Sequence, residues 1–111
     1  MLAKLYRFTT KIFNLVFRKS KRVHIDGFTF LVSPTRYNQN PRFAVVVGKK
    51  ISKKAVIRNR LRRQIYEIFR ENLLGEIMDK NIIFIYKGAD KFTEREKLIQ
   101  ACRKLVQKLK N

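Results

Sequence analysis

The feature that most constrains the fold is an alternation of short apolar runs with one long amphipathic stretch between residues 42 and 86. Residues 42–48 are almost entirely apolar, which is typical of a strand that is covered on both faces. Residues 81–86 form a second run of the same kind. From about residue 55 to 73, apolar residues recur three or four positions apart, as on the buried face of a helix. A strand, a helix and a strand are therefore predicted here in that order.

A helix and a strand are predicted before this unit. The helix covers roughly residues 10–19 and begins at a threonine, a residue that caps helix N-termini well. The strand covers residues 27–33, where alternate side chains are apolar and share one face. The polar residues 34–41 are expected to join this strand to the next one as a hairpin.

The last helix is indicated by its first turn. Thr93 and Glu96 have the spacing of a capping box, and apolar residues then recur at intervals of four, three and four up to Leu109. The complete order is helix, strand, strand, helix, strand, helix. This order predicts an α+β fold in which three helices pack on a single sheet. A length of 111 residues suits one domain over residues 1–111.

The charge of the chain is large and uneven. The formal net charge is +19, from 27 Lys and Arg against 8 Asp and Glu. Residues 1–66 contain 17 of these bases and one acid, Asp26, whereas residues 67–111 contain ten bases and seven acids. Because so much positive charge repels itself in a compact fold, we expect a polyanionic partner, for which nucleic acid is the first candidate.

Several other classes of protein are disfavoured. Cys102 is the only cysteine, so neither a disulfide within the chain nor a cysteine-based metal site is expected, and a reducing cytoplasm is the expected location. No apolar run approaches the roughly 20 residues of a membrane span. His24 has no nucleophile or second ligand beside it, and the acids show no metal-ligand spacing. No catalytic or metal-binding residue is therefore predicted.

Residues 49–63 carry the densest positive charge. Eight of these fifteen residues are basic and none is acidic. They are Lys49, Lys50, Lys53, Lys54, Arg58, Arg60, Arg62 and Arg63. The arginines lie at the start of the predicted helix, where positive charge opposes the helix dipole. Each exposed charge there lowers the stability of the helix by roughly a few tenths of a kcal/mol. A solvated helix face is one interpretation, but the absence of balancing acids favours a site for phosphate, which guanidinium binds through paired donors.

The same segment resembles the signature of the ribonuclease P protein subunit. The likeness comprises Lys49-Lys50 at the end of a strand, then Ala55, then Arg58-Asn59-Arg60 and the basic pair Arg62-Arg63. Arg7-Phe8 and the pair Phe13 and Phe17 are similar to the first helix of that family, and the element order matches over nearly the whole chain. Ser52, Ser20 and the dipeptide Phe30-Leu31 depart from the usual family residues.

This resemblance implies a fold similar to a ribosomal-protein domain, with a mixed sheet and a left-handed βαβ crossover. It implies that a catalytic RNA, with Mg²⁺ held mainly by RNA, removes the 5′ leader of precursor tRNA, and that the protein is an accessory subunit. Ribonuclease P RNA and precursor tRNA are the implied partners, and no membrane or small-molecule partner is expected. The implied contacts to the catalytic RNA are Lys49, Lys50, Lys53, Lys54, Arg58, Asn59, Arg60, Arg62 and Arg63.

The resemblance also implies a second RNA site, a cleft between the first helix and the sheet that holds the single-stranded leader. The implied contacts are Arg7, Lys11, Phe13, Phe17, Arg18 and Phe30. Aromatic faces in a basic groove suit a single strand, although the residues alone leave core packing open for Phe13 and Phe17. Two other hypotheses remain at this stage: a ribosomal or other structural RNA-binding protein, and a basic protein of DNA or membrane surfaces.

Overall fold

Two apolar strands form the centre of the fold in the computed structural model. β2 (Phe28–Pro34) and β4 (Lys80–Ile85) pair antiparallel, and both are buried over most of their length. β1 (Lys21–Ile25) pairs antiparallel with β2, and β3 (Phe43–Val46) pairs parallel with β4. The sheet therefore has the order β1-β2-β4-β3 and is mixed. The residues that the structure describes are 14, 17–35, 42–77 and 79–110.

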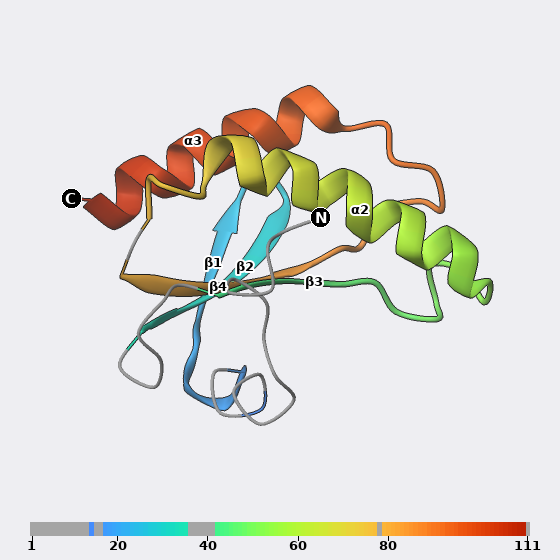
Figure 1. Ribbon diagram of the computed structural model, residues 1–111, viewed down its shortest axis with the longest axis horizontal. Coiled ribbons are helices and arrows are strands. Elements are labelled where there is room, and N and C mark those ends of the chain that lie inside the picture. Colours follow the sequence, from blue (N-terminus) through green and yellow to red (C-terminus); the bar gives the residue numbers. More distant parts are fainter. Residues whose placement is uncertain (1–13, 15–16, 36–41, 78, 111) are drawn as a thin grey trace.

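Two long helices, α2 (Ala55–Asn72) and α3 (Arg95–Lys110), cover one face of this sheet side by side (Figure 1). The residues buried from the helices are Leu61, Ile65, Ile68, Phe69, Leu98, Ala101, Cys102 and Leu105. They belong to one core with Phe30 and Phe84, whose ring centroids are 5.2 Å apart. Each large apolar side chain buried in this way contributes about 1.5–3 kcal/mol to folding.

The predicted α+β fold is confirmed, as are the long helix near residues 55–73 and the two apolar strands around 42–48 and 81–86. α2 joins the parallel neighbours β3 and β4 and so forms the crossover of a βαβ unit. The left-handed sense of this crossover stays a prediction. Of the first predicted helix, the structure describes residues 14 and 17–19, and these are helical.

Two expectations about the strands were wrong. β1 was not anticipated, because its polar residues hide the fact that only Val23 and Ile25 pack on the core. The expected hairpin between the next two strands does not form, because β4 lies between β2 and β3. Strand alternation in a sequence identifies a buried face, but it carries no information about which strand is the neighbour.

The start of α3 also differs slightly from the prediction. The N–H of Leu98 donates to the carbonyl oxygen of Glu94 at 2.9 Å. Glu94 rather than Thr93 is therefore the residue whose carbonyl accepts the first helical hydrogen bond, and the helix begins at Arg95.

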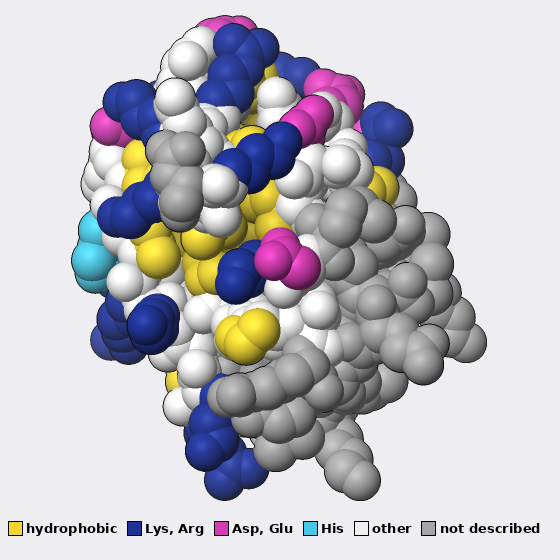
Figure 2. All heavy atoms as spheres, turned by 90° about the vertical axis from the view of Figure 1, so that its left-hand side faces the viewer, with side chains coloured by type: hydrophobic (Ala, Val, Ile, Leu, Met, Phe, Trp, Pro, Cys, Tyr) yellow, Lys and Arg dark blue, Asp and Glu magenta, His cyan; other side chains and the backbone are white. Residues whose placement is uncertain are grey.

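One end of the sheet is the place where β2 ends and β4 begins, since Pro34 is paired with Lys80. Figure 2 looks onto this end and shows apolar side chains exposed between Lys and Arg side chains.

Within the described residues, no helix has the length and apolar character needed to cross a membrane.

Candidate nucleic-acid interface

The basic segment 49–63 leaves the edge strand β3 through a tight turn. The N–H of Ile51 donates to the carbonyl oxygen of Gly48 at 3.1 Å, which closes the turn. Lys49 and Lys50 form its tip, and both are exposed. The turn therefore holds two ammonium groups close together in solvent.

Arg58 ties the following loop to the first turns of α2. Its Nη1 atom donates to the carbonyl oxygens of Ser52 and Lys53, at 3.0 Å in each case. The N–H of Lys54 donates to the hydroxyl oxygen of Ser52 at 3.2 Å. Arg58, predicted as an RNA contact, therefore also acts inside the protein, where it shapes the loop that carries Lys53 and Lys54.

The other arginines of the segment have different surroundings. The Nη1 atom of Arg62 donates to the side-chain oxygen of Asn59, so these two predicted contacts orient one another. Arg60 and Arg63 are exposed. Since they are three positions apart on a helix, their side chains lie on the same face. They are the arginines best placed to meet phosphate groups.

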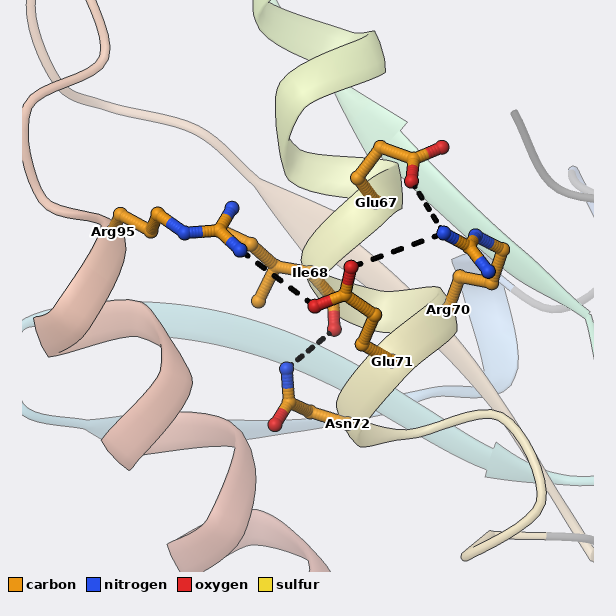
Figure 3. A network of polar contacts seen from close by, with 6 residues as sticks. All are labelled: Glu67, Ile68, Arg70, Glu71, Asn72 and Arg95. Carbon is orange, nitrogen blue, oxygen red and sulfur yellow. Dashed lines mark hydrogen bonds and ion pairs between the residues drawn. The ribbon is translucent and has the colours of Figure 1, made fainter.

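The two halves of α2 differ in how their charge is balanced. Its first turn contains no acid and no side-chain cap, and the first acid of the helix is Glu67. Glu67 lies 2.6 Å from Nη2 of Arg70, and Glu71 lies 3.8 Å from Arg70 and 3.6 Å from Arg95 of α3 (Figure 3). The hydrogen bond from Arg70 lowers the pKa of Glu67. The acids are thus paired with bases at the far half of the helix.

The one acid in the first 66 residues, Asp26, is also paired. Lys104 of α3 donates to both of its carboxylate oxygens, at 3.0 and 2.9 Å. This pair joins the turn after β1 to α3, so Asp26 is not available to neutralise the basic segment. The start of α2 therefore keeps a positive potential that attracts a polyanion.

Packing and hydrogen bonding hold the basic face in place. Leu61 and Ile65 of α2 are fully buried against the sheet. The N–H of Val45 in the edge strand donates to the hydroxyl oxygen of Tyr66 at 3.2 Å. A binding face that is carried on a fixed helix loses little conformational freedom when its partner binds.

The predicted leader-binding residues are described only in part. Arg7, Lys11 and Phe13 lie outside the described residues. Phe17 is 45% exposed, and Arg18 is exposed with its Nε atom 3.4 Å from the carbonyl oxygen of Asn14. Phe17 is therefore partly open to solvent, as an aromatic contact to a single strand requires, and Arg18 follows it in the chain.

The prediction for Phe30 was wrong. Its side chain is fully buried on the helix-covered face, with its ring 5.2 Å from Phe84 and 6.4 Å from Phe69 between centroids. Because side chains alternate along a strand, Leu31 lies on the opposite face. The faces could not be assigned from the sequence, because both are apolar in β2.

A second group of lysines was missed by sequence reasoning. Lys19, Lys21 and Lys80 surround a hollow at the end of the sheet that Figure 2 faces. The local sequence does not predict this group, because Lys80 is far from Lys19 and Lys21 in the chain. The pairing of β1 with β2 and of β2 with β4 brings these lysines together.

The single cysteine and the single histidine of the chain both contact other residues of the fold. Cys102 is fully buried in the core, and this burial raises its pKa to about 12. Nδ1 of His24 lies 3.2 Å from the hydroxyl oxygen of Thr29. Among the described residues, no three His, Cys, Asp or Glu side chains gather as a set of metal ligands.

Comparison with known proteins gives a consistent result. The sequence model of the family described as Ribonuclease P matches residues 2–110. The Ribonuclease P protein component of Microcystis aeruginosa is 42% identical over 82 residues, which cover 69% of this chain and 68% of that protein. The protein of the same name from Blochmanniella pennsylvanica is 38% identical over 94 residues, covering 78% and 80% of the two chains.

Solved structures show the same likeness in three dimensions. The RNase P protein of Staphylococcus aureus superimposes with a TM-score of 0.70 at 25% identity, covering 96% of this chain and 95% of that one. The RNase P protein from Thermotoga maritima superimposes with a TM-score of 0.61 at 28% identity, covering 95% and 92%.

Proposed function

The chain belongs to the ribonuclease P protein family, and from this premise we propose that it binds the catalytic RNA through residues 49–63 and assists removal of the 5′ leader from precursor tRNA. Members of this family are accessory subunits of a ribonucleoprotein endoribonuclease, so the partner of the chain is the ribonuclease P RNA. A cytoplasmic location is part of the same proposal.

The observation that carries the proposal is the uncompensated positive charge at the start of α2. Lys49, Lys50, Lys53, Lys54, Arg60 and Arg63 are all exposed. The loop that carries Lys53 and Lys54 is fixed by Arg58. Each phosphate that such a surface neutralises releases counterions from the RNA, and this release supplies affinity without base recognition.

A second, smaller contact is proposed for the leader. Phe17 offers part of a ring to solvent and Arg18 follows it directly. A base stacked on an aromatic ring contributes about 1–3 kcal/mol, and a neighbouring cation binds the adjoining phosphate. This contact distinguishes precursor from mature tRNA, because only the precursor carries the unpaired leader.

The proposed division of labour follows from charge. Mg²⁺, which is expected to be bound mainly by RNA, would supply the activated water. Catalytic RNA and substrate are both polyanions, which repel one another as they associate. A protein with a net charge of +19 placed between them reduces this repulsion. The benefit is therefore expected to be largest at low concentrations of divalent ions.

Binding to the purified ribonuclease P RNA tests the RNA contact. The Arg60→Ala variant should bind more weakly and should flatten the dependence of log affinity on log salt by about one unit of slope. Lys91→Ala, an exposed base outside the segment, is the control and should leave the slope unchanged. Equal slopes for wild type and Arg60→Ala would show that Arg60 contacts no phosphate of this RNA. Equal affinity for ribosomal RNA would contradict specific binding of the catalytic RNA.

A further inference from the structure

The first turn of α2 carries an exposed apolar side chain inside the basic segment 49–63. Val56 is 73% exposed, and among the described residues the one other large apolar side chain that is exposed is that of Phe17. Single apolar side chains are common at protein surfaces, so exposure alone assigns no role to Val56. The role follows from its neighbours, which are the bases proposed to meet the catalytic RNA.

Val56 lies on the same face of α2 as the two arginines that extend into solvent. Arg60 and Arg63 follow it by four and seven positions, so the three side chains form one row along the helix. Lys53 and Lys54, which are also exposed, precede it in the loop. The apolar side chain is therefore bordered by cations before and after it in the chain. Binding interfaces commonly have an apolar centre inside such a polar rim.

The fold does not account for a valine at this position. Leu61 and Ile65 are buried against the sheet and Ile57 packs on the same core, whereas Val56 belongs to neither apolar core. A β-branched residue also stabilises a helix less than alanine does. The first turns of α2 extend beyond the sheet (Figure 1), so a large partner has access to this side chain.

An unpaired nucleotide is the RNA feature that suits an apolar side chain among cations. The outside of a regular RNA duplex presents phosphates and ribose hydroxyls, and its major groove is too narrow for side chains to read. In a loop or bulge, a base that has left the stack offers an apolar face next to its own phosphates. Val56 can lie against such a base while Arg60 and Arg63 bind the phosphates.

We propose that Val56 contacts an unstacked nucleotide of the ribonuclease P RNA and thereby helps the protein to distinguish this RNA from a regular duplex. The inference rests on the proposed function of the chain. Phosphate contacts fix the position of a protein on a nucleic acid but do not by themselves discriminate between sequences. The apolar contact supplies a part of the affinity that does not depend on salt, because no counterion is released when it forms.

Titration of the full chain with purified ribonuclease P RNA at several salt concentrations tests this contact. Val56→Thr keeps the branching of the side chain but replaces a methyl group with a hydroxyl. It should weaken binding by roughly three- to tenfold at every salt concentration. The slope of log affinity against log salt should remain that of wild type, since no charge changes. Val56→Ile should retain the wild-type affinity.

Two further variants exclude an indirect effect on the helix. Val56→Ala favours the helix, so a loss of affinity in this variant cannot come from fraying, and a loss similar to that of Val56→Thr is expected. Gln100→Thr introduces the same residue at an exposed position of α3 and should change neither affinity nor slope. Val56→Thr should melt at the wild-type temperature, and its affinity for a regular RNA duplex should equal that of wild type.

The outcomes separate this contact from the proposed function. If the wild-type protein binds ribonuclease P RNA no more tightly than ribosomal RNA, the proposed function is wrong. If its binding is specific but Val56→Thr binds as tightly as wild type, or loses as much affinity for the duplex, only the contact of Val56 is wrong. A changed salt slope in Val56→Thr would assign the loss to the neighbouring phosphate contacts and would also overturn the proposal.

Discussion

The guanidinium of Arg58 donates a hydrogen bond of 3.0 Å to the carbonyl oxygen of Ser52, across the loop that connects β3 to α2. The same nitrogen donates to the next carbonyl along the chain. Within the basic segment this arginine therefore has a role in shaping the binding surface, whereas Arg60 and Arg63 point their charges into solvent. Residues that look equivalent in the sequence thus act in two ways, and experiments can separate them.

The first prediction concerns charge and geometry at Arg58. Arg58→Lys keeps the charge but replaces the planar fork with a single ammonium group, so the two carbonyls lose their shared donor. We expect affinity for ribonuclease P RNA to fall several-fold while the salt slope remains that of wild type. Amide hydrogen exchange at Lys53 and Lys54 in the free protein should become faster.

Arg60→Lys is the matched comparison, because it also preserves charge but has no loop to support. Its affinity should fall less than that of Arg58→Lys, and hydrogen exchange in the loop should not change. If Arg58→Lys binds like wild type while Arg58→Ala flattens the salt slope by about one unit, Arg58 acts as a phosphate ligand alone.

The second prediction distinguishes the two phenylalanines that were expected to meet the leader. Phe30→Ala removes a fully buried ring and should destabilise the fold by about 3–5 kcal/mol in chemical denaturation. Phe17→Ala alters a half-exposed ring and should leave the free energy of unfolding nearly unchanged. Instead it should reduce the preference of the holoenzyme for precursor over mature tRNA. A large loss of stability in Phe17→Ala would assign this ring to the core.

The third prediction concerns the anchor between α2 and the edge strand. Tyr66→Phe removes the hydroxyl that accepts the N–H of Val45, and it should cost about 0.5–1.5 kcal/mol of stability. The salt slope of RNA binding should remain that of wild type, since no charge is lost. Thermal melting and titration at several salt concentrations provide both readouts, and an altered slope would contradict the assignment.

The fourth prediction concerns the buried thiol. Burial raises the pKa of Cys102 to about 12, from an ordinary value of 9.0, so the folded state resists ionisation more than the unfolded state does. The contribution of this group to stability should be complete below pH 9 and should fall as the pH rises further toward 12. Thiol reagents should react at the rate of unfolding rather than at the rate of a free thiol.

Cys102→Ala is the control for this pH dependence. It creates a small cavity and lowers stability at neutral pH, but its stability should fall less steeply between pH 9 and 12 than that of wild type. Rapid modification of Cys102 in the native protein at neutral pH would contradict the burial on which the prediction rests.

The parts of this fold that could be predicted are those with a repeated pattern. Five apolar positions of the long helix, Ile57 to Phe69, specify which face is buried, and the structure buries four of them and packs Ile57 against the same core. Pairing could not be predicted in the same way. β1 has only two core-facing residues among charged ones, and β4 separates strands that follow one another in the chain.

The candidate sites also differ in how far they could be predicted from the sequence. The basic segment 49–63 is continuous in the sequence, so its position and exposure could be anticipated. The double role of Arg58 depends on where two carbonyl oxygens lie, and the faces of β2 depend on which side the helices cover. The lysines of the hollow come from two separate segments, Lys19 and Lys21 from one and Lys80 from the other, which the pairing of strands brings together. Contacts of this kind leave no local trace in a sequence.

The most direct test of the central claim is cleavage of precursor tRNA by ribonuclease P RNA at low magnesium concentration, with and without this protein. The rate of cleavage at the junction between leader and mature tRNA should rise strongly when the protein is added, and the benefit should shrink as magnesium is raised. An unchanged rate of cleavage at low magnesium, with a protein that is folded and bound to the RNA, would contradict the proposed function.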